Sequence, residues 1–360
     1  MKNILTSSLF RGISYGLILV IFIIAIVFFD SPSRYSISEQ YTFSSPVRSR
    51  IALAILLPGT QAYQEIKNLK VEEADKFDLR DTAGLQVVSI ESTVDKDKTI
   101  LITFDVLLQK GSLTWKGITT TGDIAPQTGI ESDNPELMAK SISITNGQDT
   151  RDARMIYDFV STWLKWPKGN RLGDSSSAMM AFRQKVGVCS DFARLTTAML
   201  RACGIPARSI VGLAMPQYIN FRQASEWNHQ AQSHAWVEFY ADGQWHFADP
   251  SWGGNSHFNN CDGFHLSYGE EQTERNVYAN CNRRISSVLN SGTGTDTNFA
   301  VIGAMSAPLK FIAAAENSRV KLTPKGMISI RYGYRLPALI ILVFLMVVFE
   351  LLVRRKHISP

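Results

Sequence analysis

Cys189 stands where the surrounding sequence would favour a reactive thiolate. In KVGVCSDFARLTTAMLRACGIPARSIVGL (185–213), one face of a predicted helix repeats at helical spacing, and Gly204 and Pro206 then predict its end. The helix therefore begins close to Cys189, just after Gly187. A thiol at that position lies beside the positive end of the helix dipole and near unpaired backbone N–H groups. These groups stabilise a thiolate and could also receive an oxyanion.

Cys203 has a different setting, because it lies on the repeating face of the same helix. That face is formed by Phe192, Leu195, Thr196, Met199, Leu200 and Cys203. A cysteine on such a stripe is expected to be a small buried side chain. Cys189 lies off the stripe and is the candidate nucleophile.

A second stretch, HAWVEFYADGQWHFADPSW (234–252), predicts a β-hairpin that turns at its Asp-Gly pair. With this turn Trp236 faces Asp249, and facing residues share one side of a hairpin. His234 and Asp249 then become diagonal neighbours on the same face, roughly 7–8 Å apart at the backbone. The other face, formed by Ala235, Val237, Phe239, His246 and Ala248, is mostly apolar and is expected to pack inward. His246 therefore fits a core residue.

Together these residues match the Cys-His-Asp arrangement of nucleophilic acyl transfer. Cys189 would be the nucleophile, His234 the base, and Asp249 the carboxylate that orients the imidazole. The argument depends on the hairpin register. A slip of one residue would place His234 and Asp249 on opposite faces.

Zinc binding is the competing chemistry, with His229, His234, Cys189 and Asp249 as ligands. The two histidines, however, lie in a loop that runs into a strand, not on one face of a helix. No Cys-x2-Cys pair accompanies them. The pattern therefore disfavours a metal site, and no cofactor is expected.

Composition and charge indicate an ordinary globular middle with basic ends. The chain has 360 residues, 45% of them hydrophobic, which is enough for two domains. The net charge of +5 comes from basic residues at the two extremes, namely Lys2, Arg11, Arg354, Arg355 and Lys356. No basic stripe is interleaved with aromatic residues, so nucleic acid is not an expected partner.

Two apolar segments, residues 13–29 and 336–353, predict transmembrane helices. No clear small-x-small cleavage site follows the first, which favours a retained anchor over a cleaved signal peptide. The flanking basic residues predict cytoplasmic termini and an exported middle. In an oxidising compartment Cys261 and Cys281 could form a disulfide, with two unpaired side chains as the alternative.

Between the two apolar segments the residue pattern changes from strands to helices. LQVVSIESTV (85–94) and TILITFDVLLQ (99–109) have period two and predict a hairpin of a small β-sandwich that turns at DKDK. TRDARMIYDFVSTWLKW (150–166) has helical periodicity. The expected order is a cytoplasmic tail (1–12), a transmembrane helix (13–29), a Ser/Pro-rich linker (30–47), a β-rich domain (48–132), a catalytic domain (133–280), a C-terminal extension (281–335), a second transmembrane helix (336–353) and a cytoplasmic tail (354–360).

Three blocks of the sequence resemble the motifs of the transglutaminase-like superfamily of cysteine enzymes. They are GVCSDFARLTTAMLRACGIPARSIVGL, SHAWVEF and GQWHFADPSW, which occur in the family's order and separation. The match covers about residues 150–252. Upstream, LPGTQAYQEIKNL is similar, more loosely, to lead-in domains of exported bacterial members.

The resemblance implies an α+β fold with a papain-like core, in which the cysteine helix packs on an antiparallel sheet. It implies the same roles for Cys189, His234 and Asp249, and it places Trp236 and Trp252 at aromatic positions that shape the site. Residues 214–233 form a longer insertion that is expected to act as a lid. No clustered acidic loop suggests the calcium site of animal transglutaminases.

The leading hypothesis is a thiol enzyme anchored in a bacterial cytoplasmic membrane, with its catalytic domain outside the cytoplasm. It would cleave amide or peptide bonds of a protein or peptide substrate, such as one of the cell envelope, through a thioester on Cys189. Protein crosslinking by transfer to an amine is one alternative, because it differs only in what resolves the thioester. A non-catalytic scaffold for envelope assembly or peptide binding is another.

Overall fold

The computed structural model describes residues 33–330, apart from 83–84, 148, 168–176, 216–230, 291–299 and 307–308. The predicted tails and membrane segments lie outside the described residues, as do residues 216–230 of the expected lid. Among the helices that are described, none is both long enough and apolar enough to cross a membrane.

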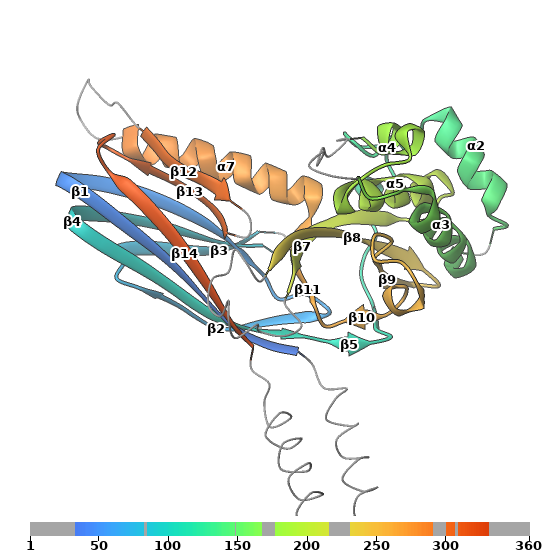
Figure 1. Ribbon diagram of the computed structural model, residues 1–360, viewed down its shortest axis with the longest axis horizontal. Helices are drawn as coiled ribbons and strands as arrows, with labels where there is room; N and C mark the ends of the chain where they lie inside the picture. Colours follow the sequence, from blue (N-terminus) through green and yellow to red (C-terminus); the bar gives the residue numbers. More distant parts are fainter. Residues whose placement is uncertain are drawn as a thin grey trace, which may run out of the picture. The chain divides into compact units, whose positions relative to one another are not determined.

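Strands and helices follow one another in groups along the described chain: β1 to β6, then α2 to α5, then β7 to β11, then α7, and finally β12 to β14 (Figure 1). The strands are β1 (Ser33–Pro58), β2 (Gln64–Glu72), β3 (Lys76–Thr82), β4 (Leu85–Leu108), β5 (Lys110–Gly111), β6 (Thr114–Trp115), β7 (Ala207–Ala214), β8 (Gln232–Ala241), β9 (Gln244–Ala248), β10 (Cys261–Asp262), β11 (His265–Glu270), β12 (Ala300–Ser306), β13 (Leu309–Ala315) and β14 (Lys321–Ile330). The α-helices are α2 (Pro135–Ile144), α3 (Asp149–Trp163), α4 (Ala178–Gln184), α5 (Cys189–Ala202) and α7 (Glu271–Asn290), and Thr121–Asp123 and Asn255–His257 form 3-10 turns.

The larger sheet joins the two ends of the described chain. In the described residues its order is β12-β13-β1-β4-β2, with β14 paired to β1 and β3 paired to β4. The alternating apolar residues of β4 that the sequence singles out, from Ile100 to Leu108, are buried as predicted. The expected C-terminal extension (281–335) thus contributes β12, β13 and β14 to this sheet, so it completes the β-rich domain.

Two local expectations differ from the structure. Residues 33–47, expected to belong to a linker, form part of β1, because Tyr35, Ile37, Tyr41 and Phe43 alternate as buried side chains within the Ser-rich sequence. The alternation of apolar residues, which is typical of a strand, therefore determines the structure here, and the Ser-rich composition typical of a linker does not.

The expected hairpin at DKDK is one continuous strand, β4, which passes through these four residues. Its first half pairs with β3 and its second half with β2. Because each half has its own partner, the two halves do not fold back on each other. Lys96 has a positive φ of 83°, a local irregularity within the strand.

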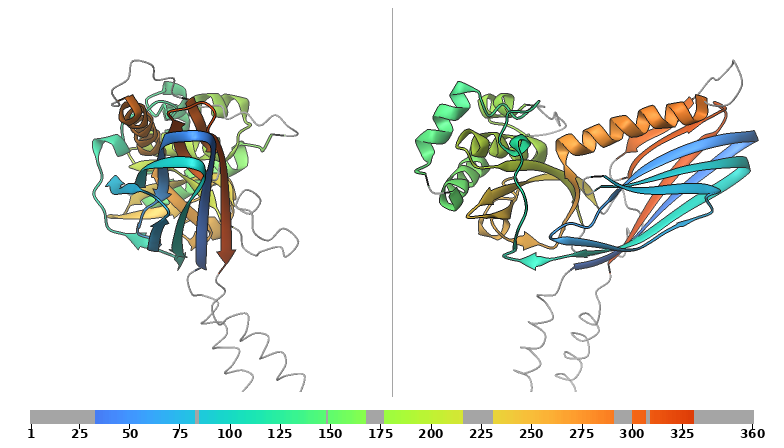
Figure 2. Two further views of the ribbon diagram at one scale, coloured as in Figure 1. Left: turned by 90° about the vertical axis from the view of Figure 1, so that its left-hand side faces the viewer. Right: turned by 180° about the vertical axis from the view of Figure 1, so that it is seen from behind.

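The second sheet carries the motif residues and has the order β11-β7-β8-β9-β6 in the described part of the chain. Helix α5 packs on β7 and β8, and α2, α3 and α4 pack around α5 (Figure 2). The apolar face of the hairpin lies in this core: Ala235, Val237, Phe239 and Ala248 are buried in one cluster with the apolar side chains of α5. Helix α7 follows β11 directly and contacts β7, β11 and β13.

Candidate active site

Cys189 is the first residue of α5, as the sequence predicts. The helix start is held by Asp191, whose buried carboxylate accepts a hydrogen bond from the backbone N–H of Val188 at 2.9 Å. Gly187 permits this close packing, since a Cβ there would lie 2.5 Å from Cβ of Asp191. The thiol of Cys189 is partly buried at the helix N-terminus.

Cys203 lies at the opposite end of the same helix, as its C-cap. Its sulfur is 3.5 Å from the Thr145 hydroxyl oxygen. Burial raises the pKa of the Cys203 thiol, which disfavours its thiolate. Cys203 is only partly buried, as Cys189 is, and not buried as expected; the two cysteines differ in their place, at the start of α5 and at its C-cap.

The hairpin has the predicted register. Val237 pairs with Ala248 and Tyr240 with Trp245, so the turn falls at Asp242-Gly243. Both turn residues have positive φ values, 49° and 80°. A tight Asp-Gly turn therefore sets which side chains share a face.

His234 and Asp249 meet on that face. The distance from His234 Nε2 to Asp249 Oδ2 is 2.8 Å, and both side chains are buried. The other carboxylate oxygen accepts hydrogen bonds from the backbone N–H and hydroxyl of Ser251, at 2.9 and 2.7 Å. Burial by itself would raise the pKa of Asp249, but hydrogen bonds from His234 and His265 lower it well below its ordinary value. The carboxylate is therefore ionised at neutral pH.

The Cys189 thiol lies near the imidazole of His234 and helps to raise the pKa of that ring. Because Nε2 is engaged by Asp249, the nitrogen left for the sulfur is Nδ1. Burial lowers the pKa of His234, but the hydrogen bond to Asp249 and the interaction with Cys189 more than offset it, and the net pKa is raised. This environment favours the imidazolium form.

Two tryptophans flank the His234 ring, with centroid separations of 6.3 Å for Trp236 and 5.0 Å for Trp252. Trp236 is fully buried, and its indole N–H donates to the Tyr63 hydroxyl at 3.2 Å. Trp236 therefore packs against the His234 ring inside the protein and does not line a surface that a substrate could contact. Trp252 is 37% exposed and covers His234 at the surface, where contact with substrate stays a prediction.

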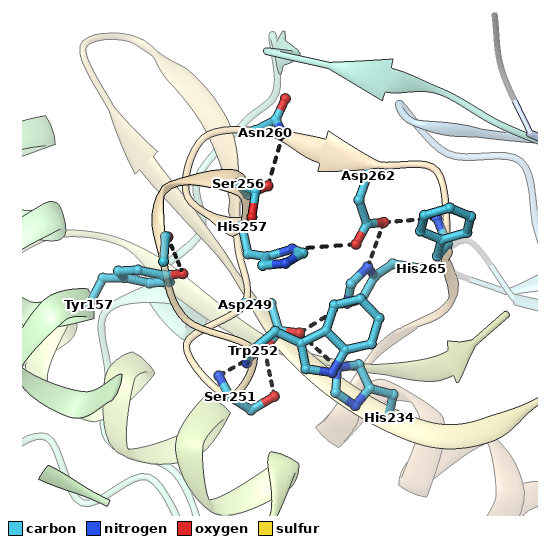
Figure 3. Close-up of polar contacts among 12 residues, drawn as sticks. Tyr157, His234, Asp249, Ser251, Trp252, Ser256, His257, Asn260, Asp262 and His265 are labelled. Carbon is cyan, nitrogen blue, oxygen red and sulfur yellow. Dashed lines mark hydrogen bonds and ion pairs between the residues drawn. The ribbon is translucent and has the colours of Figure 1, made fainter. Parts of the chain in front are cut away.

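Sequence reasoning did not single out two further residues of this network, His265 and Asp262 (Figure 3). His265 Nε2 lies 3.1 Å from Asp249 Oδ2, and its Nδ1 lies 2.9 Å from Asp262 Oδ1. His265 begins β11, which pairs with β7 and not with the hairpin. The available signal was a polar turn, CDG, before the alternating strand HLSYG.

Sequence comparison identifies the same region. The family model for the transglutaminase-like superfamily matches residues 137–250, which include Cys189, His234 and Asp249. A relative from Mycobacterium leprae (strain TN), the uncharacterized protein ML0607, is 39% identical over 239 residues, or 62% of this chain and 79% of that protein. The chain belongs to the transglutaminase-like superfamily.

Solved structures to which the chain is similar include two bacterial proteins. A proposed cysteine protease from Cytophaga hutchinsonii has 16% identity and a TM-score of 0.47, covering 83% of this chain and 98% of that one. The periplasmic domain of TgpA from Pseudomonas aeruginosa has 13% identity and a TM-score of 0.34, covering 64% of this chain and 91% of that one.

The structure changes the set of residues that could bind zinc. His229 lies outside the described residues, and the groups that could meet at a cation among those described are His234, Asp249 and His265, within 4.8 Å of one another. Both imidazole Nε2 atoms already hydrogen bond to the same carboxylate oxygen. A cation there would have to displace both N–H protons.

Of the two alternatives for Cys261 and Cys281, the structure has the one without a disulfide. Both residues belong to the described chain and are buried, but no disulfide joins them. Cys261 lies in the cluster of Tyr63 and Trp236, whereas Cys281 lies on α7 in the core of the larger sheet. Their proximity in sequence does not bring them into one core.

Proposed function

We propose that this protein is a thiol enzyme that cleaves amide bonds by acyl transfer through a thioester on Cys189. The observation that carries the proposal is the position of the His234 imidazole, which hydrogen bonds to Asp249 through one nitrogen and whose pKa is raised by the neighbouring Cys189 thiol. Nucleophile, base and orienting carboxylate are thereby connected in the order that acyl transfer needs.

In the first half-reaction, His234 takes the thiol proton and the Cys189 sulfur attacks the substrate carbonyl carbon. The negative charge passes to the carbonyl oxygen, near the N-terminus of α5, where backbone N–H groups lack helical partners. Collapse of this intermediate breaks the C–N bond. The imidazolium gives its proton to the departing amine, and the acyl group remains on sulfur as a thioester.

In the second half-reaction, His234 removes a proton from water and the hydroxide attacks the thioester. The C–S bond breaks, a carboxylic acid leaves, and the thiolate-imidazolium pair is restored. If an amine replaces water, the same steps form a new amide and crosslink two molecules. Water is our first choice. Release of free carboxylate against incorporation of a labelled amine separates the two outcomes.

Attachment to a membrane through residues 13–29 and 336–353 is part of the proposal. Support comes from the larger sheet, in which Tyr35 pairs with Ile330. The two strands that lead toward these segments are therefore neighbours at the same end of the sheet. With both anchors retained, the substrate would be a protein or peptide outside the cytoplasm. Recovery of the intact chain in the membrane fraction after alkaline washing tests the anchorage, and protease digestion of spheroplasts tests the orientation.

The reactivity of the two cysteines of α5 tests the chemistry without a known substrate. Iodoacetamide should alkylate Cys189 at neutral pH at least tenfold faster than Cys203, because only Cys189 combines a helix N-terminus with an imidazole partner. Cys203→Ala serves as the matched control and should leave the fast phase unchanged. Equal, slow alkylation of both residues would favour a non-catalytic scaffold.

A comparison of protein termini and crosslinks in cells carrying wild-type or Cys189→Ala protein would then identify the substrate. Proteins whose cleavage or crosslinking depends on Cys189 are the candidates. The proposed reaction uses no metal, so dialysis of the enzyme against a chelator should leave its activity intact.

A further inference from the structure

We infer that His265 is a positioning residue of the same site, a fixed imidazolium that holds the Asp249 carboxylate in place and sets the pH range over which Cys189 and His234 form an ion pair. This inference rests on the proposed function, since it assigns the residue to the thiol chemistry. Its first step, the permanent charge, can be tested separately.

The hydrogen bonds of His265 define its protonation. Its Nε2 lies 3.1 Å from Oδ2 of Asp249, and its Nδ1 lies 2.9 Å from Oδ1 of Asp262. An ionised carboxylate only accepts hydrogen bonds, so both ring nitrogens must carry a proton. A ring with two N–H groups is an imidazolium.

Asp262 is itself built to stay ionised. Its Oδ1 also accepts the backbone N–H of Phe264 at 2.8 Å, and His257 Nδ1 lies 3.5 Å from its Oδ2. Burial alone would raise the pKa of Asp262, but the charge of His265, the nearby His257 ring and the hydrogen bonds from His265 and Phe264 lower it well below its ordinary value. The cation is therefore held between two anions.

Three aromatic rings enclose this cation. The centroids of Trp236, Phe247 and Trp252 lie 4.9, 4.9 and 4.6 Å from the centroid of the His265 ring. The side chain is 3% exposed. Burial alone would lower the pKa of His265, but Asp262 and Asp249 raise it to about 9. The ring is thus charged throughout the neutral range.

The charged and titratable side chains around His265 belong to several different elements. Asp249 follows β9, Asp262 ends β10, His257 belongs to a 3-10 turn, and His234 lies on β8 with its ring centroid 5.1 Å away. Of these, His234 is the group whose proton the reaction uses. The charge of His265 lowers the pKa of His234, in opposition to Asp249.

Two effects on the reaction follow. His265 gives the shared oxygen of Asp249 a second donor, which restricts rotation of the carboxylate away from His234. Its positive charge also makes His234 release its proton more readily, so that the imidazole can serve as a base near neutral pH.

The variant His265→Gln tests both effects, because glutamine keeps an N–H donor but carries no charge. The upper pH limit of the Cys189–His234 ion pair, measured as the pH dependence of iodoacetamide alkylation in a Cys203→Ala background, should rise by about one unit. The matched control is His246→Gln. His246 is a buried histidine of the same hairpin that hydrogen bonds to Asn259 and to the backbone of Ala241, and it does not contact Asp249.

An unchanged upper limit in His265→Gln, or an equal shift in His246→Gln, would overturn the inference while Cys189 stays rapidly alkylated. Loss of fold is checked by circular dichroism of each variant. If wild-type Cys189 itself reacts slowly at all pH values, the proposed function fails instead.

Proton NMR of the histidine ring C–H signals tests the permanent charge on its own. In the wild type, the His265 signals should not titrate between pH 5 and 8. In Asp262→Asn, where one anion becomes neutral, titration should enter this range. A wild-type His265 that titrates near its ordinary pKa of about 6.5 would overturn the inference whatever the reactivity of Cys189.

Discussion

Asp249 lies fully buried beneath the imidazole of His234, with 2.8 Å between its Oδ2 and the ring Nε2. Among the described residues, the donors to its two oxygens are N–H and O–H groups of His234, Ser251, Trp252 and His265. The carboxylate therefore orients the His234 ring and also organises the loop that follows β9.

Replacing Asp249 by Asn should damage both activity and stability. An amide must present its NH2 group either to the two imidazoles or to the N–H and O–H groups of Ser251, so donors face donors. We expect a loss of activity of about 10³- to 10⁴-fold and a loss of about 2–4 kcal/mol in the free energy of unfolding. Steady-state kinetics and urea unfolding measure the two effects.

Asp158→Asn is the matched control for this substitution, because Asp158 is an exposed residue of α3 paired with Arg154. It should change the free energy of unfolding by less than about 0.5 kcal/mol. An Asp249→Asn protein with wild-type activity would show that His234 needs no carboxylate.

The stability of the fold should depend on pH through His265. Its pKa rises from about 6.5 in the unfolded chain to about 9 in the folded protein. A raised pKa means that the folded state holds the proton more tightly, so this contribution is complete below about pH 6.5 and disappears as the pH rises through about 9. Urea unfolding at pH 6, 8 and 10 should show a decline that His265→Gln reduces. An equal decline in both proteins would assign it to other groups.

Local pattern was sufficient to place His234 beside Asp249 and Cys189 at the start of α5, but not to predict their surroundings. The tight turn at Asp242-Gly243 and the period of two fix the faces of β8 and β9, which is why His234 and Asp249 could be placed together. Likewise, Gly204 has a positive φ of 80° just after the C-cap of α5, whose 14 residues begin at Cys189. Both features are determined by residues that lie close to one another in the sequence.

His265 could not be placed in the same way, because its strand reaches the hairpin only through β7. At that crossing Gly212 pairs with His234, and a Cβ on it would lie 2.5 Å from the Trp236 ring. The pairing of β1 with β14 also joins residues at opposite ends of the described chain. Periodicity within a segment predicts a strand but does not show which distant segment that strand pairs with.

Tyr63 connects the β-rich domain to the catalytic sheet, and its hydroxyl should contribute measurably to stability. It donates to Glu238 Oε1 at 2.9 Å and accepts from Trp236 Nε1 at 3.2 Å. Tyr63→Phe removes both bonds and leaves two buried polar groups without this partner. We expect a loss of about 2 kcal/mol in the free energy of unfolding. Differential scanning calorimetry measures it.

The pH dependence of this variant provides a second check. Burial raises the pKa of Glu238 to about 7, and the Tyr63 hydroxyl moderates that rise. A raised carboxyl pKa makes the folded state less stable as the pH increases above the ordinary value of about 4.3. Without the hydroxyl, the loss of stability should grow between pH 5 and 8. The comparison is Tyr240→Phe, because Tyr240 is a partly buried residue of β8, the strand that also carries Glu238.

A buried ion pair fixes α5, and with it Cys189, to the start of α7. Arg194 contacts both carboxylate oxygens of Glu271 through Nε at 3.1 Å, and the two side chains are only 4% and 9% exposed. Arg194→Met should cost about 3 kcal/mol, because Glu271 would remain as a buried charge short of one partner. The double variant Arg194→Met/Glu271→Leu should recover most of that loss.

The exposed pair Arg183–Glu136 is the control, and Arg183→Met should cost less than about 1 kcal/mol in the free energy of unfolding. Additive losses in the double variant would mean that the two charges stabilise α5 independently of each other.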